Sequence, residues 1–229
     1  IINIGGEAEA FQCDISDSIS TDKLAFHAAE TGEVKAVINA AGLSPHMGDA
    51  LKIMEGNALG TINITNSFYK VMLENSCIIN TSSISAYLTP EFLMPKRCYK
   101  LSLTDLKKFM SKMMARVNIF PKKTRAGVSY GISKHFVIWY SKTNAERFGE
   151  KGIRILSVTP GNFETPMGEL EKEEAGKFLK YNAIKRLGKP EEIAHLYADL
   201  IDEKLGYLTG TDIICDGGCI ASGASAFIK

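Results

Sequence analysis

The sequence has few of the features that mark membrane, secreted or nucleic-acid-binding proteins. It contains no apolar run long enough to span a bilayer and no signal-peptide pattern. Its five cysteines are odd in number and form no C-x-x-C pair, which argues against a disulfide framework and against a zinc site. A formal net charge of +1 argues against a general attraction to nucleic acid or to anionic membranes, and the basic cluster at 122–125 is typical of a solvated turn. We therefore expect a cytoplasmic protein with a small-molecule partner, no metal, no nucleic acid and no membrane.

What the sequence does contain is an alternation of short apolar runs and helical patterns over one domain, residues 1–229. The composition is 45% hydrophobic and 23% charged, which is typical of a globular protein with one core. Strands are predicted at 1–4, 10–16, 34–39, 77–83, 153–161 and 211–218, and helices at 21–30, 57–73, 130–148 and 190–200. Continuously apolar strands between helices predict an α/β fold. Its doubly wound, Rossmann-like parallel sheet is expected in three αβα layers.

Three of the predicted strands end in small or polar residues. The sequence reads N-A-A-G at 39–42, T-S-S at 81–83 and T-P-G at 159–161. Ligands of open parallel sheets bind at the carboxyl ends of the strands, so these three ends are the predicted binding site.

Six short motifs occur in order along the chain. They are N-A-A-G (39–42), N-A-L-G (57–60), T-S-S (81–83), Y-G-I-S-K (130–134), P-G-N-F-E-T (160–165) and D-G-G (216–218). Together they resemble the short-chain dehydrogenase/reductase family over nearly the whole chain except residues 86–126. The resemblance implies an NAD(P)-dependent oxidoreductase that interconverts a secondary alcohol and a ketone. Its catalytic residues would be Asn57, Ser83, Tyr130 and Lys134. Ser83 is preferred to Ser82 because the family's serine is the third residue after the strand-end asparagine, here Asn80.

The spacing of Tyr130 and Lys134 suits this chemistry. Residues i and i+4 lie one turn apart on the same face of a helix. Reduction of a carbonyl requires a proton donor near neutral pH, whereas free tyrosine titrates near pH 10, and lowering that pKa by about three units takes about 4 kcal/mol. An ammonium about 4 Å away supplies an energy of that order. Lys134 is therefore expected to lower the pKa of Tyr130.

The resemblance also implies the other contacts of the site. Lys134 would bind the nicotinamide ribose, Ser83 would orient the substrate oxygen, and Asn57 would hold a water that connects Lys134 to solvent. The predicted cofactor-binding residues are Gly5, Asp14, Ile15, Asn39, Ala40, Ala41, Gly42, Tyr130, Lys134, Pro160, Gly161 and Thr165. Asp14 and Ile15 would lie on the adenine side and Thr165 at the nicotinamide carboxamide. For Asn39, an amide that bridges two strands is an equally good interpretation.

Two departures from the family pattern stand out. The family's first strand and its glycine-rich turn, T-G-x-x-x-G-x-G, have no match, so we expect about 30 residues to be missing from the front of this chain. The strands at 1–4, 10–16 and 34–39 would then correspond to the family's second, third and fourth. The acidic residue that often ends the second strand and selects NAD is replaced by Gly5. Its absence leaves room for a 2′-phosphate, which favours NADP over NAD.

Residues 86–126 form an inserted helical segment before the active-site helix. Ser83 and Tyr130 are separated by 46 residues, where most family members have about a dozen. In this respect the chain looks most like the bacterial 3α-hydroxysteroid dehydrogenase/carbonyl reductase branch, which implies a hydroxysteroid, a bile acid or another bulky apolar carbonyl. The helix in this segment either packs on its own domain or borders a pocket or partner.

Several alternatives stay open. One is a reductase of a different ketone, such as a 3-oxoacyl thioester. Others are a non-catalytic NAD(P)-binding sensor and an interaction protein built on the inserted segment. The resemblance also implies a homo-oligomer, a dimer or tetramer, with the last helix and strand as the expected dimer contact.

Overall fold

The core of the structure is a parallel sheet. The computed structural model describes residue 3, residues 5–166, residue 176 and residues 178–224. Within these residues the sheet has the strand order β1-β2-β3-β4, and all three pairings are parallel. The strands are β1 (Ala36–Asn39), β2 (Ser76–Thr81), β3 (Ile153–Pro160) and β4 (Asp212–Cys215). Sequential parallel strands require crossovers, so their carboxyl ends share one edge of the sheet.

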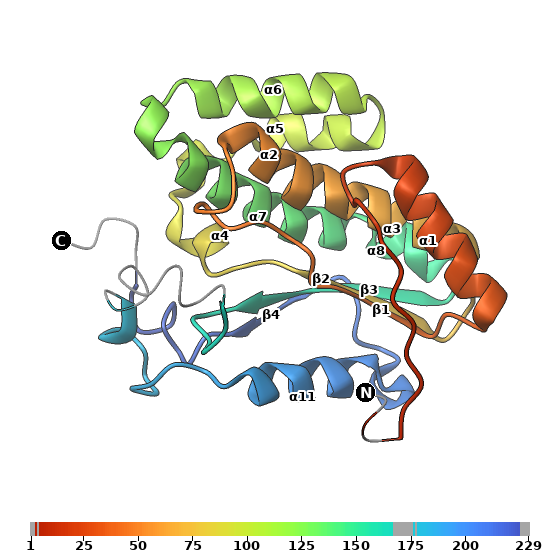
Figure 1. Cartoon of the computed structure of the whole chain (residues 1–229). Coiled ribbons are helices and arrows are strands. Elements are labelled where there is room, and N and C mark those ends of the chain that lie inside the picture. Colours follow the sequence, from red (N-terminus) through yellow and green to blue (C-terminus); the bar gives the residue numbers. More distant parts are fainter. Residues whose placement is uncertain (1–2, 4, 167–175, 177, 225–229) are drawn as a thin grey trace.

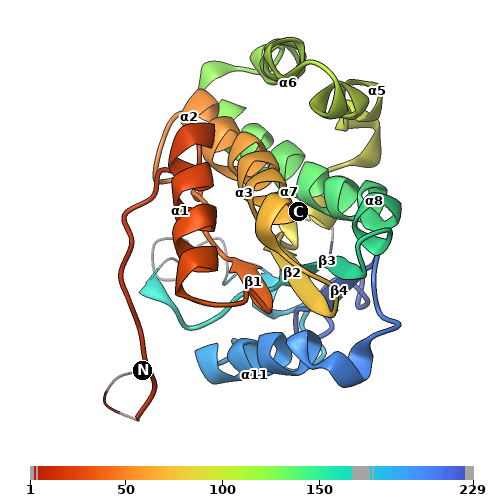
Figure 2. The same ribbon diagram turned by 90° about the vertical axis from the view of Figure 1, so that its right-hand side faces the viewer.

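Helices cover both faces of this sheet, which gives the predicted αβα layers (Figures 1 and 2). Alternate residues of β3 point to opposite faces: Ile155 packs with the core under α1 and α3, and Leu156 packs with the core under α11. The helices are α1 (Ser18–Thr31), α2 (Ala50–Met54), α3 (Gly60–Val71), α4 (Ser85–Leu88), α5 (Lys96–Tyr99), α6 (Leu106–Asn118), α7 (Arg125–Thr143), α8 (Ala145–Gly149) and α11 (Pro190–Ile201). Short 3-10 turns cover Glu91–Leu93, Lys100–Leu103, Lys122–Thr124 and Glu203–Leu205. None of the helices described is long and apolar enough to cross a bilayer.

The helix predicted at 57–73 begins earlier than expected. It runs from α2 into α3 through one π-helical turn, Glu55–Leu59, which places Asn57 inside the irregular turn. In a π-helical turn the backbone hydrogen bonds span five residues instead of four, and such turns occur frequently at functional sites. The helix predicted at 130–148 is α7 followed by α8, with Asn144 between them.

Residues 86–126, here called the 86–126 segment, contain α5, α6 and most of α4. Helix α6 begins after Asp105, whose side chain accepts a hydrogen bond from the Lys108 N–H at 2.9 Å. Its fully buried Phe109 and Met113 belong to the same core cluster as Phe136 of α7. The helix of this segment therefore packs on its own domain, which is the first of the two interpretations of its sequence.

The strand predicted at 10–16 is wrong. These residues form an irregular segment and a turn, in which the Asp17 N–H donates to the carbonyl of Asp14. A strand needs a neighbour that completes its hydrogen bonds, and in the described part of the chain the only partner of β1 is β2. Of the strand predicted at 1–4, three residues lie outside the described residues and Asn3 is not in a strand.

Candidate active site

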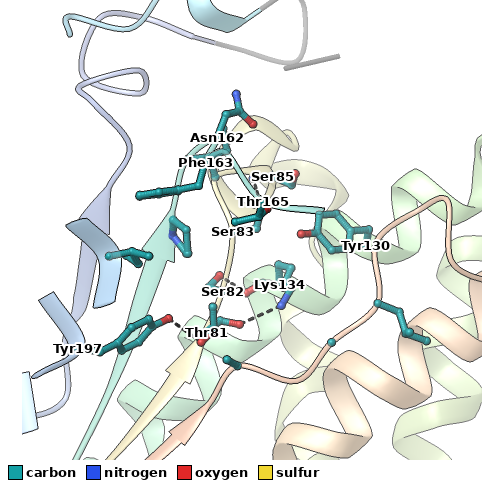
Figure 3. A pocket seen from close by; sticks show the side chains of 17 residues that line it. Thr81, Ser82, Ser83, Ser85, Tyr130, Lys134, Asn162, Phe163, Thr165 and Tyr197 are labelled. Carbon is teal, nitrogen blue, oxygen red and sulfur yellow. Dashed lines mark hydrogen bonds between the residues drawn. The ribbon is translucent and has the colours of Figure 1, made fainter. Parts of the chain in front are cut away.

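A cavity of about 260 Å³ lies at the carboxyl ends of the strands, where the sequence places the site. Three residues of the predicted tetrad line it: Ser83, Tyr130 and Lys134 (Figure 3). The remaining lining residues are Ala40, Gly42, Leu43, Thr81, Ser82, Ile84, Ser85, Pro160, Gly161, Asn162, Phe163, Thr165, Ile193 and Tyr197. The cavity thus joins polar groups from β2 and α7 to an apolar wall that α11 helps to build.

Tyr130 and Lys134 enter the cavity from the same face of α7. Their side chains are largely buried, with exposed fractions of 9% and 6%. The Lys134 Nζ lies 5.8 Å from the centroid of the Tyr130 ring and donates a hydrogen bond to the carbonyl of Thr81 at 2.9 Å. A cation in this position stabilises negative charge on the phenol oxygen more strongly than it would in bulk water.

Ser82 and Ser83 are adjacent but make different contacts. The Ser82 hydroxyl is buried and donates to the backbone carbonyl of Lys134 at 2.9 Å, which ties β2 to α7. The Ser83 Oγ accepts the Ser85 N–H at 3.2 Å, and Figure 3 shows Ser83 on the side of the cavity near Tyr130. An accepting hydroxyl keeps its own proton available to a ligand oxygen.

Asn57 lies behind the cavity and does not line it. Its side chain pairs with the backbone of Leu43, accepting the N–H at 2.8 Å and donating to the carbonyl at 3.0 Å. It also donates to the Ser133 hydroxyl at 3.3 Å. Its backbone carbonyl accepts the Thr61 hydroxyl at 2.7 Å. Asn57 therefore fixes the turn after β1 to the helix that carries the tyrosine.

Gly42 is the point at which these groups converge. A Cβ at Gly42 would lie 2.9 Å from Asn57 Oδ1 and 3.3 Å from Lys134 Nζ. The absence of a side chain is thus a requirement of close packing, which explains the glycine of the N-A-A-G motif.

A second cavity, of about 440 Å³, lies next to the first. It is lined by Asp14 and Ile15, the predicted adenine-side residues, together with Gln12, Cys13, Ser16, Ala41, Gly42, Leu43, Lys52, Glu55 and Gly56. Hydrogen bonds from the Ser16 hydroxyl and N–H, at 2.7 and 2.9 Å, lower the pKa of Asp14. Ile15 is held against Gly60 and its carbonyl accepts a hydrogen bond from Asn63 at 2.9 Å.

Pro160 ends β3, Gly161 and Thr165 follow it, and all three line the first cavity. The Gly161 N–H donates to the Cys215 carbonyl at 2.8 Å, and a Cβ there would lie only 2.6 Å from the Cα of Asp216. Asp216 in turn accepts the N–H groups of Gly218 and Ile220, both at 2.8 Å. The D-G-G motif therefore shapes the loop after β4, on which the nicotinamide-side loop packs.

Two predicted cofactor residues, Gly5 and Asn39, line neither cavity. Gly5 lines neither of them and has no atom within 4 Å of its ideal Cβ position. Asn39 is 6% exposed and donates from its Nδ2 to Asn80 Oδ1 at 3.0 Å, so it makes the strand-bridging contact that the sequence suggested. The remaining predicted cofactor-binding residues all line one or both of the cavities.

Sequence reasoning did not find Tyr197 as a site residue, although it pairs with Thr81 of the predicted T-S-S motif. Their hydroxyls are 2.7 Å apart, and the Thr81 carbonyl is the acceptor of Lys134 Nζ. Thr81 belongs to the T-S-S strand end that the sequence predicted as part of the binding site. Tyr197 lies on α11, more than sixty residues from Tyr130, and carries no local motif.

The two cavities fit an extended dinucleotide. Gly42 and Leu43 line both, so the cavities meet at the turn after β1. Gly42 also packs against Asn57 and Lys134, which fixes the turn between the two cavities. No group of three His, Cys, Asp or Glu side chains suited to a metal ion occurs among the residues described.

The family follows from comparison with known proteins. A family model described as "short chain dehydrogenase" matches residues 1–120, just over half of the 229 residues, and one described as "Enoyl-(Acyl carrier protein) reductase" matches residues 109–219. The chain belongs to the short-chain dehydrogenase/reductase family. Members of this family are oxidoreductases that bind NAD(P), so the protein is an NAD(P)-dependent enzyme.

Individual relatives agree with this family. The "Short-chain dehydrogenase/reductase bsc3" of Alternaria brassicicola is 29% identical over 213 residues, which cover 91% of this chain and 76% of that protein. The human "(3R)-3-hydroxyacyl-CoA dehydrogenase" is 28% identical over 227 residues, 93% of this chain and 74% of that protein.

Solved structures share the fold. The 3-alpha-hydroxysteroid dehydrogenase from Pseudomonas sp. B-0831, complexed with NADH, has a TM-score of 0.79 at 18% identity and covers 94% of this chain and 85% of its own. A short chain dehydrogenase from Burkholderia cenocepacia J2315, in complex with NADP, has a TM-score of 0.73 at 21% identity, over 96% and 79% of the two chains.

Proposed function

We propose that this short-chain dehydrogenase/reductase interconverts a secondary alcohol and a ketone with Tyr130 as the acid–base residue. The observation that carries the proposal is the meeting of Ser83, Tyr130 and Lys134 in one cavity at the carboxyl ends of the strands. Ser83 follows β2, whereas Tyr130 and Lys134 lie one turn apart on α7, so the fold brings the serine to the tyrosine–lysine pair. It supplies a proton donor, a cation and an orienting hydroxyl around one ligand oxygen.

Each residue has a distinct part in the reduction of a ketone. A bound nicotinamide supplies the hydride. Ser83 donates a hydrogen bond to the carbonyl oxygen and holds it beside Tyr130, whose hydroxyl transfers its proton to that oxygen as negative charge develops there. Lys134 stabilises the phenolate that remains. In the oxidation direction the phenolate accepts the proton of the alcohol, so the same three groups serve both directions.

Asn57 acts as a positioning residue in this proposal. Its amide holds Leu43 and Ser133, and a Cβ at Gly42 would crowd both Asn57 and Lys134. The water that the family resemblance gives to Asn57 would connect Lys134 to solvent and return the proton. Rigid support of this kind keeps the reacting groups within the narrow geometric range that proton transfer needs.

The proposed substrate is a bulky apolar carbonyl compound, such as a hydroxysteroid or bile acid. Ile84, Phe163 and Ile193 give the first cavity an apolar wall, which suits a ligand with few polar groups. The similar Pseudomonas structure is that of a 3-alpha-hydroxysteroid dehydrogenase, which is consistent with this class. The name of the human relative favours a 3-hydroxyacyl or 3-oxoacyl thioester as the second candidate.

We propose that the protein is located in the cytoplasm. All five cysteines are free, with Cys77 and Cys219 buried, which is consistent with the reducing cytoplasm.

We propose NADP as the preferred cofactor, because the position expected to carry an NAD-selecting acid is Gly5. We also propose a dimer through α11 and β4, since β4 is an edge strand of the described sheet and its Ile214 is 42% exposed.

The test is a substrate panel assayed with NADPH and NADH. The panel contains a 3-oxosteroid, a 3-oxoacyl thioester and a small cyclic ketone. Tyr130→Phe should bind the cofactor with nearly unchanged affinity and lower kcat by at least about 10²-fold, the usual contribution of general acid catalysis. Tyr69→Phe, on α3, is the control and should keep its rate. A Tyr130→Phe enzyme with more than about a tenth of the wild-type rate would refute the role, and turnover of the thioester alone would refute the steroid-like substrate.

A further inference from the structure

The near-zero net charge of the chain hides a strong segregation of charge. The 86–126 segment contains ten Lys and Arg residues but only two acidic residues, so its formal charge is +8. Because the whole chain carries +1, the remaining 188 residues carry −7. The near-zero total charge therefore does not exclude an anionic partner for this segment.

The basic residues lie on one side of the molecule. In both views α5 and α6 form an outer layer beyond α2 and α7, on the opposite side of the protein from α11 (Figures 1 and 2). Lys108, Lys112 and Ile119 are exposed and spaced four and seven residues apart, so they share the outward face of α6. The inward face is fixed by Phe109, Met113 and Val117, all fully buried.

Little of this positive charge is neutralised within the chain. Of the ion pairs formed by the residues described, one lies in the segment and joins Lys96 to Glu91. The other acidic residue, Asp105, is engaged as the cap of α6. Arg116 and Arg125 bind backbone carbonyls. Within the part of the chain that the structure describes, five exposed lysines form no ion pair: Lys107, Lys108, Lys112, Lys122 and Lys123.

Large apolar side chains are exposed among these lysines. Ile119 is 70% exposed and lies at the carboxyl end of α6, where Arg125 ties the Lys122–Thr124 turn to the helix through the Asn118 carbonyl. Phe92 is 74% exposed and is held beside α6 by a 3.0 Å hydrogen bond from Arg116 to its carbonyl. At the other end of α6, Leu103 in the preceding 3-10 turn is 49% exposed.

We propose that the outer face of α6, with its flanking turns, is a docking surface for an anionic lipid bilayer. Lysines attract the acidic headgroups, and exposed aliphatic and aromatic side chains enter the boundary between headgroups and acyl chains. The face is a protruding helix of 13 residues, about 20 Å long, which matches a flat partner better than a small ligand. The −7 charge of the rest of the chain turns this side toward the membrane. A nucleic acid would satisfy the lysines but would leave the exposed Ile119 and Phe92 without a role.

The test is co-sedimentation of the full chain with vesicles of phosphatidylcholine, alone or with about one third phosphatidylserine. The first variant carries Lys107→Glu, Lys108→Glu and Lys112→Glu. Its matched control carries Lys23→Glu, Lys35→Glu and Lys204→Glu, three exposed lysines outside the segment, and so has the same net charge. We expect wild-type protein to bind the acidic vesicles only, with an affinity that falls as salt is raised. The α6 triple variant should bind at least about 100-fold more weakly, and the control within about threefold of wild type.

Ile119→Ser tests the apolar part of the surface without changing charge. It should lower vesicle affinity about tenfold, as expected for the loss of one buried aliphatic side chain. It also serves as the second variant if the α6 triple variant unfolds, which circular dichroism would reveal. Failure of the wild-type protein to bind acidic vesicles would overturn the proposal, as would equal losses in the two triple variants. Tighter binding to a single-stranded oligonucleotide through the same lysines would assign the surface to nucleic acid instead.

Discussion

The Nζ of Lys134 donates a 2.9 Å hydrogen bond to the backbone carbonyl of Thr81, so the active-site helix is fastened to the end of β2 through its lysine. The hydroxyl of Thr81 in turn pairs with Tyr197 at 2.7 Å. Helices on opposite faces of the sheet, α7 and α11, therefore meet at one strand end. This arrangement fixes the direction of the ammonium relative to the Tyr130 ring, and it makes the lysine part of both the proposed chemistry and the packing.

Lys134→Met should lower kcat by about 10² to 10⁴-fold, the range of general acid–base catalysis, because the phenolate of Tyr130 loses its nearby cation. The methionine side chain fills a similar volume, so the fold should persist. Steady-state kinetics and the melting temperature are the measurements. Lys142→Met, two turns further along α7 and exposed, is the control and should leave kcat unchanged. Retention of wild-type kcat by Lys134→Met would remove the lysine from the mechanism.

Ser82→Ala and Ser83→Ala should have opposite effects. Ser83→Ala removes the hydroxyl that faces the cavity and should lower kcat/KM by about 10²-fold, as loss of one oxyanion donor does, with little change in stability. Ser82→Ala removes the 2.9 Å bond to the Lys134 carbonyl and should cost about 1–2 kcal/mol of unfolding free energy. Urea unfolding and kcat/KM, measured on both variants, separate the two roles. The reverse pattern would make Ser82 the substrate-orienting residue.

The sequence predicted the part of the site that depends on strand ends and motifs. The turns after β1, β2 and β3 lie at one edge of the sheet because the strands are parallel, and this brings Gly42, Ser83 and Gly161 to one cavity. Residues 10–16 alternate apolar and polar side chains, as a strand does, but have no neighbouring strand among the residues described, so pairing, which a local pattern cannot encode, decided their structure. Tyr197 was missed for a related reason, since only the tertiary fold brings α11 to Thr81.

Gly42→Ala should damage the site by adding a single methyl group. The new Cβ would lie 2.9 Å from Asn57 Oδ1, which already accepts the Leu43 N–H, and 3.3 Å from Lys134 Nζ. One of these groups must move, and a misplacement of about 1 Å can cost about 10²-fold in rate. We expect kcat/KM to fall by about 10 to 100-fold on that basis. The control is Gly127→Ala on α7, where no atom lies within 4 Å of the Cβ position. Equal activity of both variants would show that the site tolerates the methyl group.

His135 gives the fold a dependence on pH below neutrality. Burial, with the nearby Lys96 ammonium, lowers the pKa of the His135 imidazole from 6.5 to about 4, while Glu91 opposes the shift. Its Nδ1 lies 3.2 Å from the Tyr99 hydroxyl, a hydrogen bond that the neutral ring can accept and the protonated ring cannot.

In the unfolded chain this ring is protonated below pH 6.5, whereas in the folded protein it stays neutral down to about pH 4. The stabilisation is therefore complete above pH 6.5 and is lost progressively as the pH falls toward 4, because the unfolded state binds the extra proton. For a ring that is partly exposed, we expect a loss of about 1–2 kcal/mol across this window.

The measurement is urea unfolding of the wild type and of His135→Gln at several pH values between 4 and 6.5. The amide of glutamine can still bond to Tyr99 but takes up no proton, so the variant should lack this part of the pH dependence. Carboxylates such as Glu192, whose pKa is lowered to about 2 by Arg186, affect both proteins alike and cancel in the difference. Parallel stability curves for the two proteins across this window would show that His135 titrates normally in the folded state.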